Sequence, residues 1–347
     1  NLVADMLGDA RLPLTSRLLL LEVVAESGLP ALPASWEVRL PSNFDSASPA
    51  VRHQSVRAVA ALDTGAFDDE LRELAHDDQQ SAELRIDALA AFADRRKEVS
   101  DGELTFLLSQ MADDTAPLRK LAAAKTVVQL PLSGTQRLNI AEQLGMSGPL
   151  TAGVLLREFS RDLNSKLAQA VLKSLEALPD GVHLPKPELL AFLESAPQPL
   201  RASVQKFVSS RLDQRTNRIL LEKRESALLA GNVERGREIF VGKTSACSSC
   251  HTIAGQGGKV GPDLTKIGAI RKKRDLLEAI MFPSASFARG YKTWTVVTDR
   301  GRVHSGLITR ETTDSLVLRK SDLSEVRIFR GSIETLREAT ASVMPEG

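Results

Sequence analysis

The stretch "ACSSCHTIAGQGGKVGPDL" (residues 246–264) decides how the last third of this chain is interpreted. It holds both cysteines of the 347 residues, Cys247 and Cys250, and His251 follows directly after the second. Two intervening residues bring the two sulfurs within about one helical turn of each other. Cysteine occurs nowhere else, so the pair meets a need that is local to this stretch.

Three kinds of site use such a pair. A zinc site normally needs two more Cys or His ligands at similar spacing, and the remaining histidines are isolated along the chain: His53, His76, His183 and His304. A thioredoxin-like dithiol belongs to a βαβ unit, and no such unit is visible. Covalent haem attachment accounts for every position, because both sulfurs form thioether bonds and the next imidazole reaches the iron. We therefore expect one haem c, held by Cys247, Cys250 and His251.

The flanking residues resemble a c-type cytochrome domain. "GNVERGREIF" resembles the N-terminal helix of such domains, and "GPDL" resembles the loop on the proximal side of the haem. This resemblance implies that the Pro262 carbonyl accepts a hydrogen bond from Nδ1 of His251, which fixes the tautomer of the iron ligand. It also implies that Leu264 belongs to the haem-binding residues. "VMPEG" resembles the distal loop, with Met344 as the sixth ligand of the iron.

The order of motifs is similar to that in one bacterial family of haem-c domains. "CSSCHTIAGQGGKVGPDLTKIG" is followed by "PSASFARGY", a strand-rich insert and "SVMPEG". Members of this family often follow HEAT repeats, and many also follow a sugar-dehydrogenase-like β-propeller in a large parent protein. The chain starts at Asn1 rather than at methionine, so we expect it to be part of such a parent. The resemblance implies electron transfer that serves a fused dehydrogenase domain or a partner redox protein.

Residues 1–213 repeat one pattern: a loop with small residues or proline, an apolar-Arg pair, and an amphipathic helix. The arginines that mark it are Arg52, Arg85, Arg119 and Arg201, at intervals of 33, 34 and 82 residues. Such a period, with two helices in each unit, indicates an α-solenoid in which neighbouring pairs bury each other's apolar faces. The pattern resembles HEAT repeats, and an irregular helical bundle is the alternative. A protein partner on the repeats is expected.

From residue 291 the helical period changes to an alternating one. "YKTWTVVTD", "RVHSGLITRE", "DSLVLRK" and "EVRIFRG" predict four short strands over residues 291–330, with a hairpin turn at Gly301. The last residues, "SIETLREATASVMPEG", are predicted as a short helix and a loop.

The expected fold class is mainly α. A HEAT-like solenoid (1–213) precedes a linker helix (214–232) and a class I-like cytochrome c domain (233–347). That domain carries a small antiparallel insert (about 291–330).

Charge and hydropathy restrict the partners. The net charge is +1, although residues 231–347 carry +6 and the rest −5, so no nucleic-acid partner is expected. No apolar run reaches the roughly 18 residues of a transmembrane helix. Because haem c is attached outside the cytoplasm, we expect a periplasmic or exported protein. If Met344 does not bind iron, the open sixth position suits a peroxidase-like enzyme or a sensor of small ligands.

Overall fold

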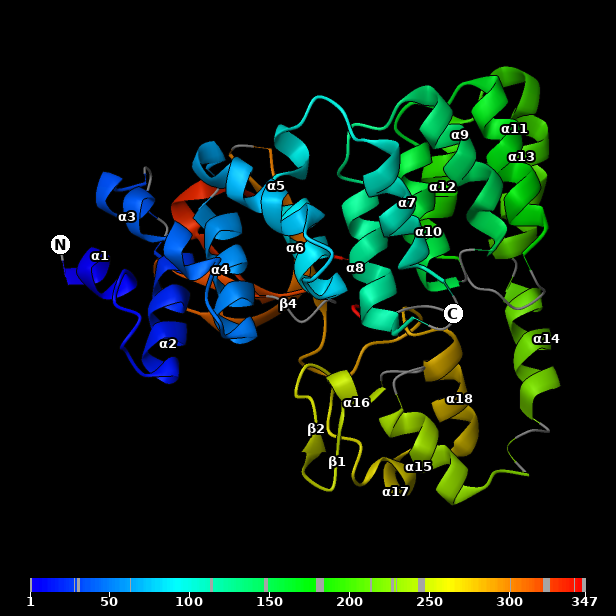
Figure 1. Cartoon of the computed structure of the whole chain (residues 1–347). Helices are drawn as coiled ribbons and strands as arrows, with labels where there is room; N and C mark the ends of the chain where they lie inside the picture. Colours follow the sequence, from blue (N-terminus) through cyan, green and yellow to red (C-terminus); the bar gives the residue numbers. More distant parts are fainter. Residues whose placement is uncertain are drawn as a thin grey trace.

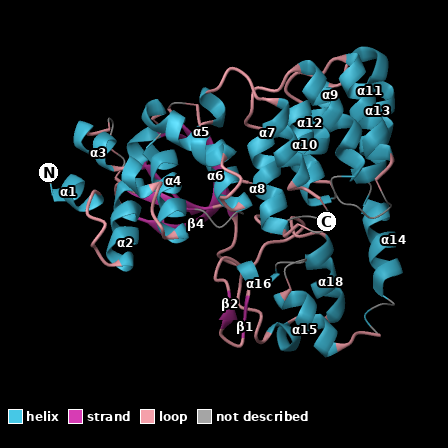
Figure 2. Ribbon diagram, in the orientation of Figure 1, coloured by secondary structure: helices cyan, strands magenta, loops and turns pink. Residues whose placement is uncertain are grey.

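The structure is a computed structural model of the chain. It describes residues 2–27, 29, 32–62, 64–112, 115–146, 149–178, 184–212, 214–225, 228, 230–242, 247–299, 301–320, 325–339 and 341–344. Helices dominate the first 225 residues, and the strands follow residue 250 (Figure 2). Within these described residues, no helix combines the length and the apolar character needed to cross a membrane.

The first part of the chain is an array of short helices (Figure 1). They are α1 (Leu2–Leu7), α2 (Leu14–Ala25), α3 (Ala34–Arg39), α4 (Pro49–Leu62), α5 (Asp68–His76), α6 (Ala82–Ala91), α7 (Asp101–Ser109), α8 (Pro117–Val127), α9 (Gly134–Gln143), α10 (Pro149–Phe159), α11 (Ser165–Glu176), α12 (Lys186–Ser195), α13 (Gln198–Leu212) and α14 (Gln214–Glu225). Polar N-caps start several of them. Ser100 and Ser133 form capping boxes with Glu103 and Gln136, which satisfy backbone donors that the first turn leaves free.

The helices recur with a regular period. α4, α6, α8, α10 and α12 each contact the next and begin at residues 49, 82, 117, 149 and 186. α5, α7, α9, α11 and α13 alternate with them and begin at residues 68, 101, 134, 165 and 198. α5 packs on α6, α7 on α8, and α11 on both α9 and α13. One continuous core of buried aliphatic and aromatic side chains runs through the array from Ala4 to Val208.

The repeated arginines have local structural partners. Nε of Arg85 on α6 donates to the carbonyl of Ala75, one residue before the end of α5, over 2.9 Å. Arg52 donates through Nη1 to the carbonyl of Ser46. Nε of Arg119 on α8 donates to Glu83 on α6 over 2.8 Å. These bonds join each arginine to the turn or helix before it.

Arg201 does not continue this series. It is exposed and lies on α13, which belongs with α9 and α11 rather than with α4, α6 and α8. The spacing of arginines therefore locates three successive helices of one set, whereas the fourth arginine marks a helix of the other set.

The predicted insert is an antiparallel sheet of five strands: β3 (Thr293–Thr298), β4 (Val303–Glu311), β5 (Ser315–Arg319), β6 (Glu325–Phe329) and β7 (Ile333–Glu338). Their order is β6-β5-β4-β3-β7. All four predicted strands are confirmed. Gly301 has φ +74°, and its N–H donates to the Thr298 carbonyl over 2.8 Å in the β3–β4 turn. Val296 opposes His304 in this pair.

The predicted C-terminal helix is wrong, because residues 333–338 form β7. Glu334, Leu336, Arg337 and Glu338 are good helix formers, but β7 instead pairs with β3, with Val296 opposite Leu336. Intrinsic preference is weak compared with the hydrogen bonds that a neighbouring strand edge offers. The sheet thus extends to residue 338 rather than to about 330. Its small core is formed by Val296, Leu316, Leu318 and Ile328.

Candidate functional site

The cysteine pair lies on one helical turn, α16 (Cys247–Cys250). The backbone N–H of His251 donates to the carbonyl of Cys247 over 2.9 Å, so the histidine continues the turn. Neither cysteine is joined in a disulfide, both are half-buried, and burial raises the pKa of each thiol. The two cysteines and the histidine therefore belong to a single helical turn.

The predicted bond between His251 and Pro262 is present. Nδ1 of His251 lies 2.8 Å from the Pro262 carbonyl oxygen. Because a carbonyl can only accept, Nδ1 must carry the proton, and Nε2 is left with its lone pair. An imidazole in this tautomer, fixed at one nitrogen, is suited to bind a metal through the other.

A close backbone approach sets this geometry. The N–H of Gly261 donates to the Cys250 carbonyl over 2.7 Å. A Cβ on Gly261 would stand 2.4 Å from Cε1 of His251, far inside van der Waals contact. A Cβ on Gly258 would stand 1.9 Å from the Ser249 carbonyl oxygen. These glycines allow the loop to pack directly on α16 and on the His251 ring.

A short hairpin and a side-chain network hold the same loop. β1 (Thr252–Ile253) pairs with β2 (Gln256–Gly257). The N–H of Leu264 donates to the Thr252 carbonyl over 2.8 Å, and the Leu264 side chain is half-buried. Oγ1 of Thr265 accepts from the N–H of Ala254 over 2.8 Å, while the N–H of Thr265 donates to Asp263 over 2.7 Å. That hydrogen bond, with one from the Thr265 hydroxyl, lowers the pKa of Asp263.

The helices around α16 lack a core of their own. They are α15 (Val233–Val241), α17 (Ile267–Ile270) and α18 (Lys273–Met281), and like α16 they contain no buried residue. Among the described residues of 233–282, only Thr252, Val260 and Phe282 are buried. Neither buried cluster of the molecule includes residues of α15–α18.

Half-buried apolar side chains occur where a core is missing. They are Phe240 on α15 and Leu276, Leu277 and Met281 on α18. Apolar helix faces are normally covered. We therefore expect a large apolar group to cover the apolar faces of α15 and α18. A haem attached to Cys247 and Cys250 fits this expectation. Sequence motifs point to the cysteines but do not single out Leu277 or Met281, whose half-burial is visible only in the structure.

Met344 lies in the described part of the C-terminal segment, and Pro345–Gly347 lie outside it. Its side chain is half-buried. Its N–H donates to Oγ of Ser342 over 3.1 Å. The N–H of Ser342 in turn donates to Oγ of Ser284 over 3.0 Å. The sequence gives no indication of this contact between residues so far apart.

Two other sequence features have different surroundings. His304 lies on β4 opposite Val296, and burial, with the charges of Lys320 and Arg302, lowers its pKa to about 4. It is therefore a neutral residue of the sheet at physiological pH. In the basic run 271–274, Arg274 pairs with Glu225 over 2.8 Å and so joins α18 to α14.

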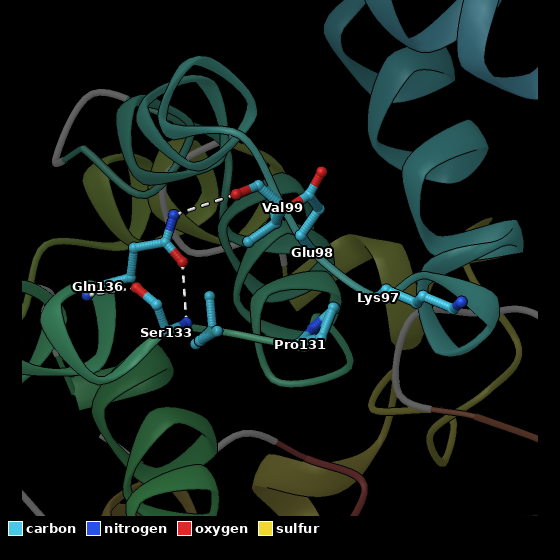
Figure 3. Close-up of a pocket in the computed structure, with 7 residues that line it drawn as sticks. Lys97, Glu98, Val99, Pro131, Ser133 and Gln136 are labelled. Atoms are coloured by element: carbon cyan, nitrogen blue, oxygen red, sulfur yellow. Dashed lines mark hydrogen bonds between the residues drawn. The ribbon is translucent and has the colours of Figure 1, made fainter.

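A separate pocket lies in the helical array (Figure 3). It is lined by Lys97, Glu98, Val99, Pro131, Leu132, Ser133 and Gln136. The Gln136 amide donates to the Val99 carbonyl over 3.1 Å and accepts from the N–H of Ser133 over 3.0 Å. The Gln136 amide is thus bonded to the backbone of Val99 and Ser133, and we assign the pocket no role. Across the residues that the structure describes, no three His, Cys, Asp or Glu side chains gather as a metal site would require.

Residues 233–302 match the family model of cytochrome c. This part of the chain is a cytochrome c domain. The matched segment includes α15, the CSSCH turn, the proximal loop, α18 and β3, and it ends before β4. The cytochrome c domain implies covalently bound haem c and haem-based electron transfer. Met344 lies outside the match, which therefore does not bear on the sixth ligand. No curated protein matches the chain.

Proposed function

We propose that the chain transfers electrons through one haem c, bound covalently to Cys247 and Cys250 and ligated by His251 and Met344. Haem iron supplies one-electron chemistry when it is bound. The observation that carries the proposal is the CSSCH turn whose histidine is already fixed by Pro262 over 2.8 Å. The absence of buried residues on α15–α18 supports it.

The residues of the domain have separable tasks. The two thiols would supply the sulfurs of the thioether bonds. The Pro262 carbonyl holds the proton on Nδ1, which leaves Nε2 as the donor to iron and strengthens it. Thioether sulfur at the sixth position would favour the ferrous state and raise the reduction potential. The half-buried Leu277 and Met281 would offer apolar surface to the haem.

We further propose that the helical part is a HEAT-like solenoid that holds a protein partner. The recurrence of helix starts at intervals of 33, 35, 32 and 37 residues from α4 to α12 supports this assignment. Electron transfer requires an electron donor. We propose that this donor is a dehydrogenase, either fused to the chain or separate from it. Because haem c is attached outside the cytoplasm, we propose a periplasmic or exported location. Electron transfer to a partner docked near the +6 C-terminal part is consistent with its charge.

The proposal is tested by denaturing electrophoresis with haem staining. The unaltered chain should keep its haem, because thioether bonds survive denaturation and extraction with acidified acetone. Replacing Cys247 and Cys250 together by alanine should abolish the stained band. If acidified acetone removes the haem from the unaltered chain, the covalent assignment is wrong.

A further inference from the structure

We propose that Ser284 is a positioning residue for the sixth ligand of the haem iron. Its hydroxyl holds Ser342, whose own hydroxyl holds the backbone of Met344. The inference rests on the proposed His251/Met344 ligation and assigns a role to Ser284 and Ser342.

The first contact crosses 58 residues of chain. The N–H of Ser342 donates to Oγ of Ser284 over 3.0 Å, in a partly buried place. β7 ends at Glu338, and the N–H of Ala339 makes a further bond to the Thr293 carbonyl over 2.8 Å. Beyond that point a backbone donor needs a partner other than a strand. The Ser284 hydroxyl supplies it.

The second contact is local. The N–H of Met344 donates to Oγ of Ser342, two residues earlier, over 3.1 Å. Such a bond between a serine hydroxyl and the backbone two residues on forms a compact turn. It restricts the backbone of Met344 and therefore the range of positions open to its thioether. The two contacts in series tie Met344 to residue 284.

Ser284 itself follows two buried residues. It belongs to a turn closed by the N–H of Ala285, which donates to the Phe282 carbonyl over 2.9 Å. Phe282 is buried, and so is Pro283, a residue type whose fixed φ suits the second position of a turn. This turn follows directly on α18, whose Leu277 and Met281 are half-buried without a protein core around them. The two hydrogen bonds in series from Ser284 through Ser342 to Met344, called the clamp below, thus join the distal segment to the turn that follows α18.

The role is one of position rather than ligation. A serine hydroxyl at residue 284 touches the backbone of the distal segment, not the iron. Its removal should leave covalent haem attachment unchanged, because Cys247, Cys250 and His251 are held by another loop. It should instead loosen the bond between iron and the Met344 sulfur, so that an added ligand competes more easily.

The experiment compares Ser284→Ala, Ser342→Ala and Ser284→Thr with a matched control, Ser286→Ala. Ser286 lies near the same turn and is exposed. The readouts are the weak near-infrared sulfur-to-iron band of the oxidised protein, the apparent affinity for added imidazole, and deuterium exchange at the Ser342 amide. Loss of one net hydrogen bond should raise imidazole affinity by about threefold to tenfold in both alanine variants. Ser284→Thr keeps a hydroxyl, so its imidazole affinity should be close to that of the unaltered protein.

Each outcome bears on the clamp separately from the proposed function. Faster exchange at Ser342 together with tighter imidazole binding in Ser284→Ala, but not in Ser286→Ala, supports it. An unaltered protein that shows the band, with Ser284→Ala identical to it in imidazole affinity and exchange, overturns the clamp and leaves His251/Met344 ligation standing. Haem retained on a chain that lacks the band overturns the clamp and Met344 ligation together, whereas loss of haem from the unaltered chain refutes the proposed function.

Discussion

Nδ1 of His251 lies 2.8 Å from the carbonyl oxygen of Pro262, so the proximal imidazole is oriented by the protein itself. The adjacent Gly261 makes this possible, because any side chain there would overlap the ring. Because residue 261 has no Cβ, the loop can approach the His251 ring. The bond from Nδ1 to Pro262 then leaves Nε2 available to bind iron.

Gly261→Ala should therefore destabilise the cytochrome c domain. The added methyl would stand 2.4 Å from Cε1 of His251, so either the ring or the loop must move. Overpacking of this kind costs about 1–3 kcal/mol. Urea denaturation of the haem-bearing protein should show the lower free energy of unfolding, and the variant should be isolated with less haem per chain. Gly268→Ala is the control, since nothing lies within 4 Å of its Cβ position. Equal stability of the two variants would contradict the prediction.

Met344→Leu should remove the near-infrared sulfur-to-iron band of the oxidised protein and allow carbon monoxide to bind the reduced form. Leucine keeps the volume of the side chain but has no sulfur. Met281→Leu is the matched control, because Met281 is also a half-buried methionine beside the proposed cavity. Absorption spectra of both variants, oxidised and reduced with carbon monoxide, test whether Met344 is the ligand. Loss of the band in Met281→Leu, with the band kept in Met344→Leu, would transfer the ligand role to Met281.

Arg85→Ala should destabilise the helical array. Nε of Arg85 donates to the Ala75 carbonyl over 2.9 Å, and its guanidinium lies 4.0 Å from the centre of the Phe106 ring. A bond from a charged donor and a cation–π contact together contribute about 2 kcal/mol. Arg201→Ala provides the comparison, since Arg201 occupies the same sequence pattern but is exposed. Thermal unfolding of both variants should show a lower melting temperature for Arg85→Ala and little change in melting temperature for Arg201→Ala.

Glu103 makes the stability of the array depend on pH. Burial tends to raise the pKa of this carboxyl, but hydrogen bonds from Arg96 and Ser100 outweigh burial and lower the pKa from 4.5 to about 2. A carboxyl with a depressed pKa in the folded state stabilises above its unfolded pKa of 4.5 and loses that contribution as the pH falls toward 2. The contribution is up to about 3 kcal/mol.

Glu103→Gln should remove this pH dependence. The variant should be less stable than the unaltered protein at pH 7, and the difference should shrink steadily between pH 4.5 and pH 2. Unfolding free energies measured across that range test it, with the exposed Glu98→Gln as the control. A difference that stays constant down to the lower pH would show that Glu103 acts through packing alone.

The proximal half of the site could be predicted from the sequence because its parts are close together in the chain. Cys247, Cys250 and His251 share one turn, and Pro262 follows within eleven residues, so local geometry is enough to bring them together. The four strands of the insert were predictable for a similar reason, since alternation and turn residues are local signals.

Other features depend on contacts that no local pattern encodes. Four of the six residues of β7 are good helix formers, and the segment becomes a strand because the edge of β3 is open to it. The bond between Ser284 and Ser342 joins two ordinary loop serines. The half-buried Leu277 lies on α18, which has no buried residue, and hydrophobic spacing alone cannot distinguish a helix face covered by protein from one covered by a cofactor.

The central claim is that one haem is bound covalently to the CSSCH turn, and the mass of the intact chain under denaturing conditions tests it most directly. The account predicts a chain heavier by the mass of one haem, with the increment located on the peptide that contains Cys247 and Cys250. Replacement of both cysteines by alanine should return the chain to its bare mass. A haem-loaded preparation whose denatured chain shows the bare mass, or an increment on a different peptide, would contradict the account.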